Sequence, residues 1–384
     1  MRCSPASAGG VANPGLVDRS VRDAPLRRFG RWLLLATLIS ITLGCGGKRM
    51  PARYAHVLRG PEEPRDVAQK IRPPTEDCRR EAIHAVRSEA DILSAPLPYE
   101  VHAGYAEVLR GLHPLAQQVL RRTSGVWFAS EMPGASARFV PCDGEDGMRG
   151  LILVDVDANP LEDGAIDVDV PTQYWRLLGG DSEAVRADET ADALVAEHKA
   201  ARYVLLHEIG HALSLLSGEF VLNDQRQFEL PHWKSYASFS WRPRRLGALG
   251  DELHDHGGVV PSALGLSDWR AIRRSLGSSS TFLAPGYRRH NRLDAMRRCH
   301  AADRLPRAGF VTPTAATAPT EDYAELFAHA ILAAEGKLHP DDVLRVQLPG
   351  CAPELQPMPY FVSGVADKRA YIEAQLGLSA VHAP

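Results

Sequence analysis

Hydrophobic positions in the first third of the chain recur with the period of a helix. The pattern predicts helices over Thr75–Leu93 and Tyr99–Arg122. The second of these carries an apolar stripe, which predicts a side that faces the core. The stripe consists of Leu109, Leu112, Leu115, Val119 and Leu120.

The period then changes to that of strands. Gly125–Pro141 and Gly150–Ala158 carry strand signals, and the polar run 143–147 between them predicts a turn. The pattern is helical again over Ala193–Leu216, which contains no proline, and over Ala366–Leu376 near the C-terminus. A small mixed sheet, a long central helix and a mostly helical C-terminal half predict an α+β fold.

Residues 218–309 form a long insert of aromatic and basic character. An insert of this length is too long for a bare loop. We therefore expect helices within it, one of them over Ser267–Leu276, that form a lid or wall over a cleft. His254 and His256 flank Asp255, but without a third ligand nearby the simpler interpretation is a polar loop.

The central helix contains His207-Glu208-Ile209-Gly210-His211, an H-E-x-x-H pattern. On an α-helix, His207 and His211 are one turn apart and rotated by only about 40°, so both imidazoles can bind one metal ion. Glu208 lies about 100° round the helix from His207, outside the first coordination shell. That position suits a general base acting on a water molecule.

A long chain can contain this pattern by chance, and the alternative is a surface helix with unrelated histidines. The flanking positions argue against chance, because Leu194, Val204, Leu205 and Leu213 make the helix apolar around the polar triplet. Charged groups on a buried helix cost several kcal/mol, roughly, unless they are paired. A metal ion is a suitable partner.

A tetrahedral catalytic site needs a third protein ligand. Ser214 and Ser217 occupy the positions that the extended H-E-x-x-H-x-x-G-x-x-H pattern requires as glycine and histidine, which excludes that subclass. A helix beginning at Pro319 and Thr320 offers Glu321 and Glu325 on one face. One carboxylate can bind the metal and the other can orient a ligand histidine. The alternative is an acidic first turn that favours the helix dipole.

The H-E-I-G-H helix, together with the segment from Phe310 to Ala328, resembles the gluzincin metallopeptidases. The branch most similar contains anthrax lethal factor, the Mlc titration factor and uncharacterised bacterial relatives. The resemblance implies a zincin-like domain and a zinc-dependent endopeptidase acting on a peptide or protein substrate. It also implies that His207, His211 and Glu321 bind Zn²⁺, that Glu208 is the base, and that Glu325 supports a ligand from the second shell.

Thr314 departs from this family, whose members tend to carry tyrosine at that position to stabilise the oxyanion. A threonine hydroxyl reaches several ångströms less far, and Tyr287, His290 and His232 are the other possible donors. The departure supports an alternative function, a catalytically weak or inactive zinc-binding lipoprotein that acts as a binding module.

The N-terminus predicts export. Arg27, Arg28 and Arg31 precede the apolar run Trp32–Leu43, which is too short to span a membrane and is followed by Gly44 and Cys45. The ending resembles a bacterial lipobox with Cys45 as the lipidated residue; the alternatives are an ordinary signal peptide or a single anchor helix. We expect a signal peptide over 1–45, a flexible tether over 46–75 and the metallopeptidase domain over 76–384, held at the cell envelope by lipid.

Composition fits a globular exported protein. The chain has 384 residues, 45% of them hydrophobic and 24% charged, with a formal net charge of −3, which gives no indication of a nucleic-acid partner. In an oxidising compartment the cysteines beyond Cys45 predict disulfides, and the alternative is buried free thiols. Three pairings are possible for Cys78, Cys142, Cys299 and Cys351, and the simplest joins Cys78 to Cys142 and Cys299 to Cys351.

Overall fold

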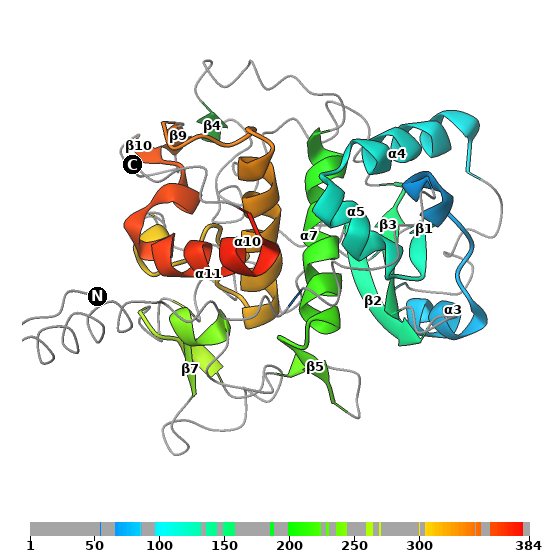
Figure 1. Cartoon of the computed structure of the whole chain (residues 1–384), viewed down its shortest axis with the longest axis horizontal. Helices are drawn as coiled ribbons and strands as arrows, with labels where there is room; N and C mark the ends of the chain where they lie inside the picture. Colours follow the sequence, from blue (N-terminus) through cyan, green and yellow to red (C-terminus); the bar gives the residue numbers. More distant parts are fainter. Residues whose placement is uncertain are drawn as a thin grey trace, which may run out of the picture. The chain divides into compact units, whose positions relative to one another are not determined.

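The computed structural model divides into two units, Met1–Met50 and Pro51–Pro384. The residues that it describes all belong to the second unit (Figure 1). The expected signal peptide and Cys45 lie outside them. The described residues are 54, 66–84, 86, 97–130, 132, 136–143, 149–157, 185–187, 199–223, 228–229, 236–243, 259–263, 269, 299, 304–341, 343–346 and 354–378.

A small mixed sheet forms the N-terminal half of the fold. It consists of β1 (Gly125–Ala129), β2 (Ala137–Asp143) and β3 (Arg149–Asp155) in the order β1-β3-β2. β3 is parallel to β1 and antiparallel to β2. The segment expected as one strand over Gly125–Pro141 thus contains β1 and most of β2. β3 is central and almost wholly buried, whereas β2 is an edge strand.

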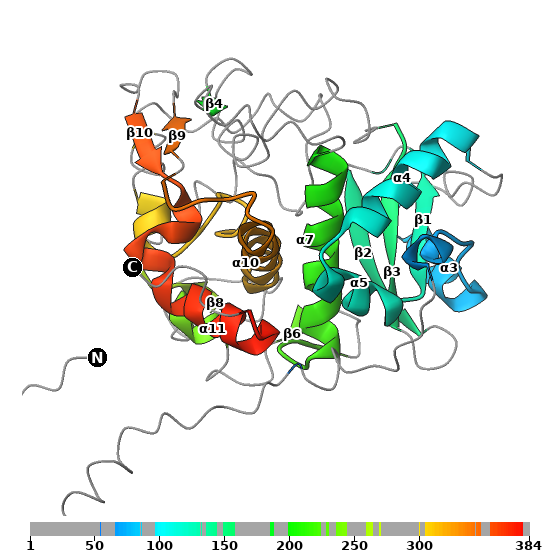
Figure 2. The same ribbon diagram turned by 45° about the horizontal axis from the view of Figure 1, so that its top comes forward.

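Helices cover the sheet. The long helix α7 (Lys199–Leu216) packs against β2 and β3, and α3 (Glu76–Ile83) contacts the same two strands. Figure 2 shows α7 between the sheet on one side and α10 (Pro319–Ala334) on the other. The α+β class and its small mixed sheet are therefore confirmed.

The helix expected over Tyr99–Arg122 is two helices, α4 (Tyr99–Gly111) and α5 (Pro114–Arg121). Pro114 explains the break, because proline lacks a backbone N–H and its ring clashes with the carbonyl one turn earlier. His113 begins α5 as its N-cap, with its side chain accepting a hydrogen bond from the Leu115 amide. The apolar stripe is buried as predicted, apart from the half-buried Leu115.

The folded unit reaches upstream of Glu76, into the segment expected to be a tether. A 3-10 helix, η1 (Val67–Lys70), buries Val67 and Ala68. Ile71 then forms a bridge with Val126 of β1, and Tyr54 is fully buried. The composition of this segment resembles a linker, but these few apolar side chains are enough to fix its described part on the domain.

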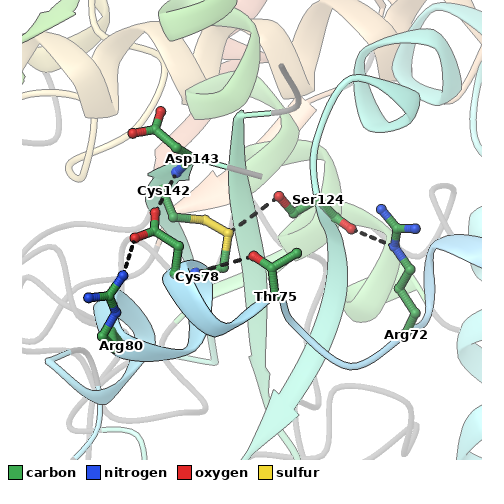
Figure 3. Close-up of a disulfide and its surroundings, with 8 residues drawn as sticks. Arg72, Thr75, Cys78, Arg80, Ser124, Cys142 and Asp143 are labelled. Atoms are coloured by element: carbon green, nitrogen blue, oxygen red, sulfur yellow. Dashed lines mark hydrogen bonds and ion pairs between the residues drawn. A yellow bond between two sulfur atoms is a disulfide. The ribbon is translucent and has the colours of Figure 1, made fainter. Parts of the chain in front are cut away.

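A disulfide joins α3 to β2 (Figure 3). It links Cys78 to Cys142, as the simplest pairing predicts. Beside it the Asp143 amide donates to Asp77 Oδ2 over 3.1 Å. Cys299 is also disulfide-bonded, and Cys351, its expected partner, lies outside the described residues.

The C-terminal half is built on α10 and α11 (Ala366–Leu376), with the short 3-10 helices η8 (Pro359–Phe361) and η9 (Ser363–Val365) before α11. A buried ion pair fixes α11 on α10, since Lys368 Nζ lies 2.6 Å from Asp322 Oδ1. The indole of Trp241, from the insert, donates to the other oxygen of the same carboxylate over 3.0 Å.

Three short ladders complete the described strands. They are β10-β9-β4 (Glu354–Pro357, Val343–Val346 and Val185–Ala187), β5-β6 (Val221–Leu222 and Phe228–Glu229) and β7-β8 (Trp241–Pro243 and Val259–Pro261), with η5 (Tyr236–Phe239) before β7. Of the helix expected over Ser267–Leu276, only Trp269 is described; its indole donates to the Ala316 carbonyl over 2.8 Å. The insert over 218–309 is described at 218–223, 228–229, 236–243, 259–263, 269, 299 and 304–309, where it contributes the short strands β5 to β8 and η5, and the rest of the expected lid lies outside the described residues.

Within the described ranges, no helix is both long enough and apolar enough to cross a membrane.

Candidate metal centre

Two facing rows of side chains run along α7 and α10. Tyr203, His207 and His211 occupy positions i, i+4 and i+8 of α7, which places them on one face. Glu321, Glu325 and His329 have the same spacing on α10. Tyr203 and His207 contact Glu325, whereas His211 contacts Glu321, so the two helices run antiparallel and the rows meet in reverse order.

Gly210 allows the two helices to approach closely. A Cβ at this position would lie 2.8 Å from the Ala324 Cα and 3.1 Å from the Ala324 carbonyl oxygen. Real Cβ atoms do not come that close to backbone, so any larger residue would force α7 and α10 apart. The glycine of the H-E-I-G-H segment therefore serves the contact between the helices.

The predicted ligands converge between the helices. His207 Nε2 lies 3.1 Å from His211 Nε2 and 3.2 Å from Glu321 Oε2, and His211 Nε2 lies 3.6 Å from Glu321 Oε1. All three residues are buried, and their ligand atoms lie within 4.8 Å of one another. Among the residues that the structure describes, this is the group of histidine and acidic side chains that can hold a metal ion.

Glu325 lies behind His207, where the sequence predicts it. Glu325 Oε1 is 2.8 Å from His207 Nδ1, and the carboxylate is fully buried. This contact assigns the proton of a neutral His207 to Nδ1, which leaves the Nε2 lone pair directed at His211 and Glu321. Lone pairs from two imidazoles and a carboxylate thus point at a common centre, which is the donor set that fits a metal ion.

Electrostatics agree with a positive charge at this centre. Burial lowers the pKa of His207, but the carboxylates of Glu325, Glu321 and Glu208 more than compensate and hold it well above the usual value. Burial raises the pKa of Glu321, yet His211 and His207 bring it well below the normal range. Glu321 is therefore ionised, and its negative charge attracts a cation, as the binding of a divalent metal requires.

Glu208 faces the sheet. Its Oε2 accepts a hydrogen bond of 2.5 Å from the backbone amide of Phe139 in β2, and its side chain is buried. The edge strand of the sheet is therefore directly beside the predicted base, which itself adjoins His207 along α7.

Thr314 lies buried in the turn that leads into α10. Its carbonyl oxygen accepts a hydrogen bond of 2.7 Å from the Thr317 hydroxyl. The other possible oxyanion donors, Tyr287, His290 and His232, fall outside the described residues, and so does the predicted lipidation site, Cys45.

Two members of the rows escaped the sequence analysis. Tyr203 donates a short hydrogen bond to Glu325 Oε2, and its ring meets that of His329 edge-on at 5.8 Å. His329 Nδ1 lies 2.8 Å from the Glu325 carbonyl oxygen. The signal that could have found them is the spacing itself, since each continues the pattern of its helix by one further turn.

No protein-family model, curated protein or solved structure matches this chain.

Proposed function

We propose that the chain is a zinc-dependent endopeptidase of gluzincin type. The observation that carries the proposal is the buried convergence of His207, His211 and Glu321, with Glu208 next to the first ligand in sequence. Two imidazoles and one carboxylate form one of the ligand sets found in catalytic zinc sites. A bound zinc ion supplies Lewis acidity, which polarises a carbonyl group and makes a water molecule more acidic.

The protein's own residues supply the remaining chemistry. Glu208 accepts the proton of the attacking water and delivers it to the nitrogen of the leaving amine. Glu325 holds His207 with its Nε2 lone pair toward the centre. The edge strand β2 contacts Glu208 through Phe139, so an extended peptide paired with this edge would run past the base. These features favour a peptide over a compact small molecule.

The order of the sheet and helices along the chain supports a zincin-like domain. A small mixed sheet precedes a helix with the H-E-x-x-H pattern, and a later helix supplies the third acidic residue. Glu325 is one turn beyond Glu321 and contacts His207, as the gluzincin resemblance implies.

The proposal includes the cell envelope as the location, with Cys45 lipidated. The basic residues and short apolar run before Cys45 support it, and an exported chain is consistent with the disulfide between Cys78 and Cys142. Mass spectrometry of the mature protein should find a diacylated or triacylated N-terminal cysteine. A soluble product that begins at another residue would refute this part of the proposal.

Metal analysis of purified full-chain variants tests the centre. His207→Ala, His211→Ala and Glu321→Ala each remove a ligand, so bound zinc should fall sharply. His102→Ala removes an exposed histidine of α4 and should leave zinc content unchanged. Full zinc content in Glu321→Ala would overturn the ligand assignment.

Digestion of a broad peptide library tests the chemistry. Glu208→Gln should retain zinc and lose hydrolysis, because an amide cannot accept the proton of water. Hydrolysis that persists in Glu208→Gln would exclude Glu208 as the base.

The second candidate function is a weak or inactive zinc-binding lipoprotein, and Thr314 is the observation that favours it. Thr314→Tyr distinguishes the two, because a restored phenol can raise turnover by roughly 10²-fold if the site is an active peptidase that lacks one oxyanion donor. If both the wild type and Thr314→Tyr bind zinc but cleave no peptide in the library, the result refutes the peptidase and favours the binding function.

A further inference from the structure

We propose that Tyr203 is a positioning residue of the metal centre, which acts on the ligand His207 through Glu325. The inference rests on the metal centre of the proposed function, but does not require that the centre hydrolyse peptides. Tyr203 precedes His207 by one turn of α7 and lies in the same row of side chains.

The two oxygens of Glu325 have different partners. The Tyr203 hydroxyl donates to Oε2, while Oε1 lies 2.8 Å from His207 Nδ1. A carboxylate with only the histidine as partner could rotate about its last bond, but the hydroxyl fixes one oxygen and thereby directs the other. Tyr203 thus determines where the acceptor for His207 lies.

Burial makes this orientation depend on protein groups. Tyr203 is 1% exposed and Glu325 is fully buried, so bulk solvent does not reach the carboxylate. Among the described residues, the other titratable groups at this end of the rows are His207, whose Nδ1 faces the carboxylate, and His329, whose Nδ1 contacts the backbone carbonyl of Glu325. The Tyr203 ring packs edge-on against His329, which holds the hydroxyl in place.

The consequence concerns metal affinity. A carboxylate that accepts from a ligand histidine fixes the ring's tautomer and direction and increases its basicity, and losing such support typically weakens metal binding by about 10- to 100-fold. Tyr203 acts on the ligand His207 through Glu325 and not directly. We therefore expect Tyr203→Phe to weaken zinc binding by about 10-fold, at the lower end of this range. The variant keeps the ring that packs on His329 and removes only the hydroxyl.

Zinc affinity of the full chain, measured by competition with a chromophoric chelator, tests the proposal. Tyr105→Phe is the matched control, because Tyr105 is a buried tyrosine of α4 that lies on neither row, and it should leave zinc affinity unchanged. The visible spectrum of the Co²⁺-substituted protein provides a second measurement, which should shift in Tyr203→Phe if the geometry at His207 changes.

A double-variant cycle separates positioning from a general effect on folding. In a Glu325→Ala background Tyr203→Phe should no longer change zinc affinity, since the carboxylate through which it acts is gone. Wild-type affinity and an unchanged Co²⁺ spectrum in Tyr203→Phe would overturn the inference, as would an equal loss in the Glu325→Ala background. A wild-type chain that binds no zinc would refute the metal centre together with this role. Zinc binding without hydrolysis would refute only the peptidase.

Discussion

Gly210 of α7 lies against the backbone of Ala324 in α10, so closely that a Cβ at Gly210 would be 2.8 Å from the Ala324 Cα. Alanine at Gly210 should therefore separate the helices that carry the candidate metal centre. Alanine is favoured over glycine within a helix by about 0.8–1.0 kcal/mol, but overpacking costs about 1–3 kcal/mol. We expect a net loss of stability in urea unfolding, together with weaker zinc binding.

Gly111→Ala is the matched control. Gly111 is the last residue of α4 and also lies near α7. A Cβ added there would meet only the end of the Arg202 side chain, at 3.4 Å. This variant should be neutral or slightly more stable. Equal behaviour of the two variants would show that the approach of α7 to α10 does not depend on Gly210.

The sequence could point to the residues of the candidate metal centre because their pattern is local. His207, Glu208 and His211 lie within one helix, and Glu321 and Glu325 lie within another, so helical periodicity alone places each group on one face. Periodicity cannot say which faces meet. The contact of Tyr203 with Glu325 and the close approach of Gly210 to Ala324 both depend on the position of α10, which periodicity does not contain.

Prediction of the sheet from the sequence is limited in the same way. Strand-forming residues predicted β1, β2 and β3, but the order β1-β3-β2 is a property of long-range pairing that composition does not contain. The contacts that hold η1 on the domain are also long-range. Lys70 Nζ, for example, donates over 2.8 Å to the carbonyl of Thr123, which is 53 residues further along the chain.

The buried pair of Asp322 and Lys368 should be costly to break. Burial raises the pKa of Asp322 and lowers that of Lys368, despite their mutual attraction. Lys368→Met would leave a buried carboxylate without its cation and should reduce the free energy of unfolding by about 3–5 kcal/mol. Adding Asp322→Leu to this variant should restore part of the loss, because the remaining charge is then removed as well.

Lys337→Met provides the comparison for a partly exposed pair. Lys337 Nζ lies 3.7 Å from Glu335 Oε2, and its side chain is 27% exposed. Its loss should change stability by less than about 1 kcal/mol. Urea unfolding of the metal-free proteins measures both effects, and similar losses in the two lysine variants would contradict the role given to burial.

His113 should make stability depend on pH. Its Nδ1 caps α5 by accepting from the Leu115 amide over 3.3 Å, which requires the neutral ring. Burial lowers the pKa of His113, with Arg202 adding to the effect and Glu335 opposing it. The folded protein therefore binds fewer protons than the unfolded chain, and this contribution to stability is present above about pH 6.5 and is lost as the pH falls through the folded pKa.

Asn caps helices without titrating, so His113→Asn should lose less stability than the wild type when the pH is lowered from 7.5 to 5.5. The difference should remain below about 1 kcal/mol, as expected for a partly exposed cap. Urea unfolding at both values measures it. His102→Asn, which changes an exposed histidine, should keep the pH dependence of the wild type. If His113→Asn and the wild type lose the same stability between pH 7.5 and 5.5, the His113 cap is not the source of the pH dependence.

The disulfide between Cys78 and Cys142 should stabilise the N-terminal half. It closes a loop with a sequence separation of 64, for which the loss of chain entropy predicts about 4 kcal/mol, with measured values usually between about 2 and 4. The double variant Cys78→Ser/Cys142→Ser should unfold at a correspondingly lower urea concentration under oxidising conditions. In the wild type, neither thiol should react with an alkylating agent before reduction, and labelling of either would show that the bond is absent.

Tyr203 and Glu325 are 122 residues apart in the sequence, so a ribosome finishes the histidine-bearing helix long before it begins the helix with the third ligand. A growing chain at that stage has the proposed base and two imidazoles, but no enclosed site in which they could act. Bringing the two helices together closes a long loop, at an entropic cost that packing between them must offset. The candidate metal centre therefore forms only after α10 has been synthesised and has docked on α7. The order of the parts along the chain thus delays assembly of the candidate metal centre until both helices have been made.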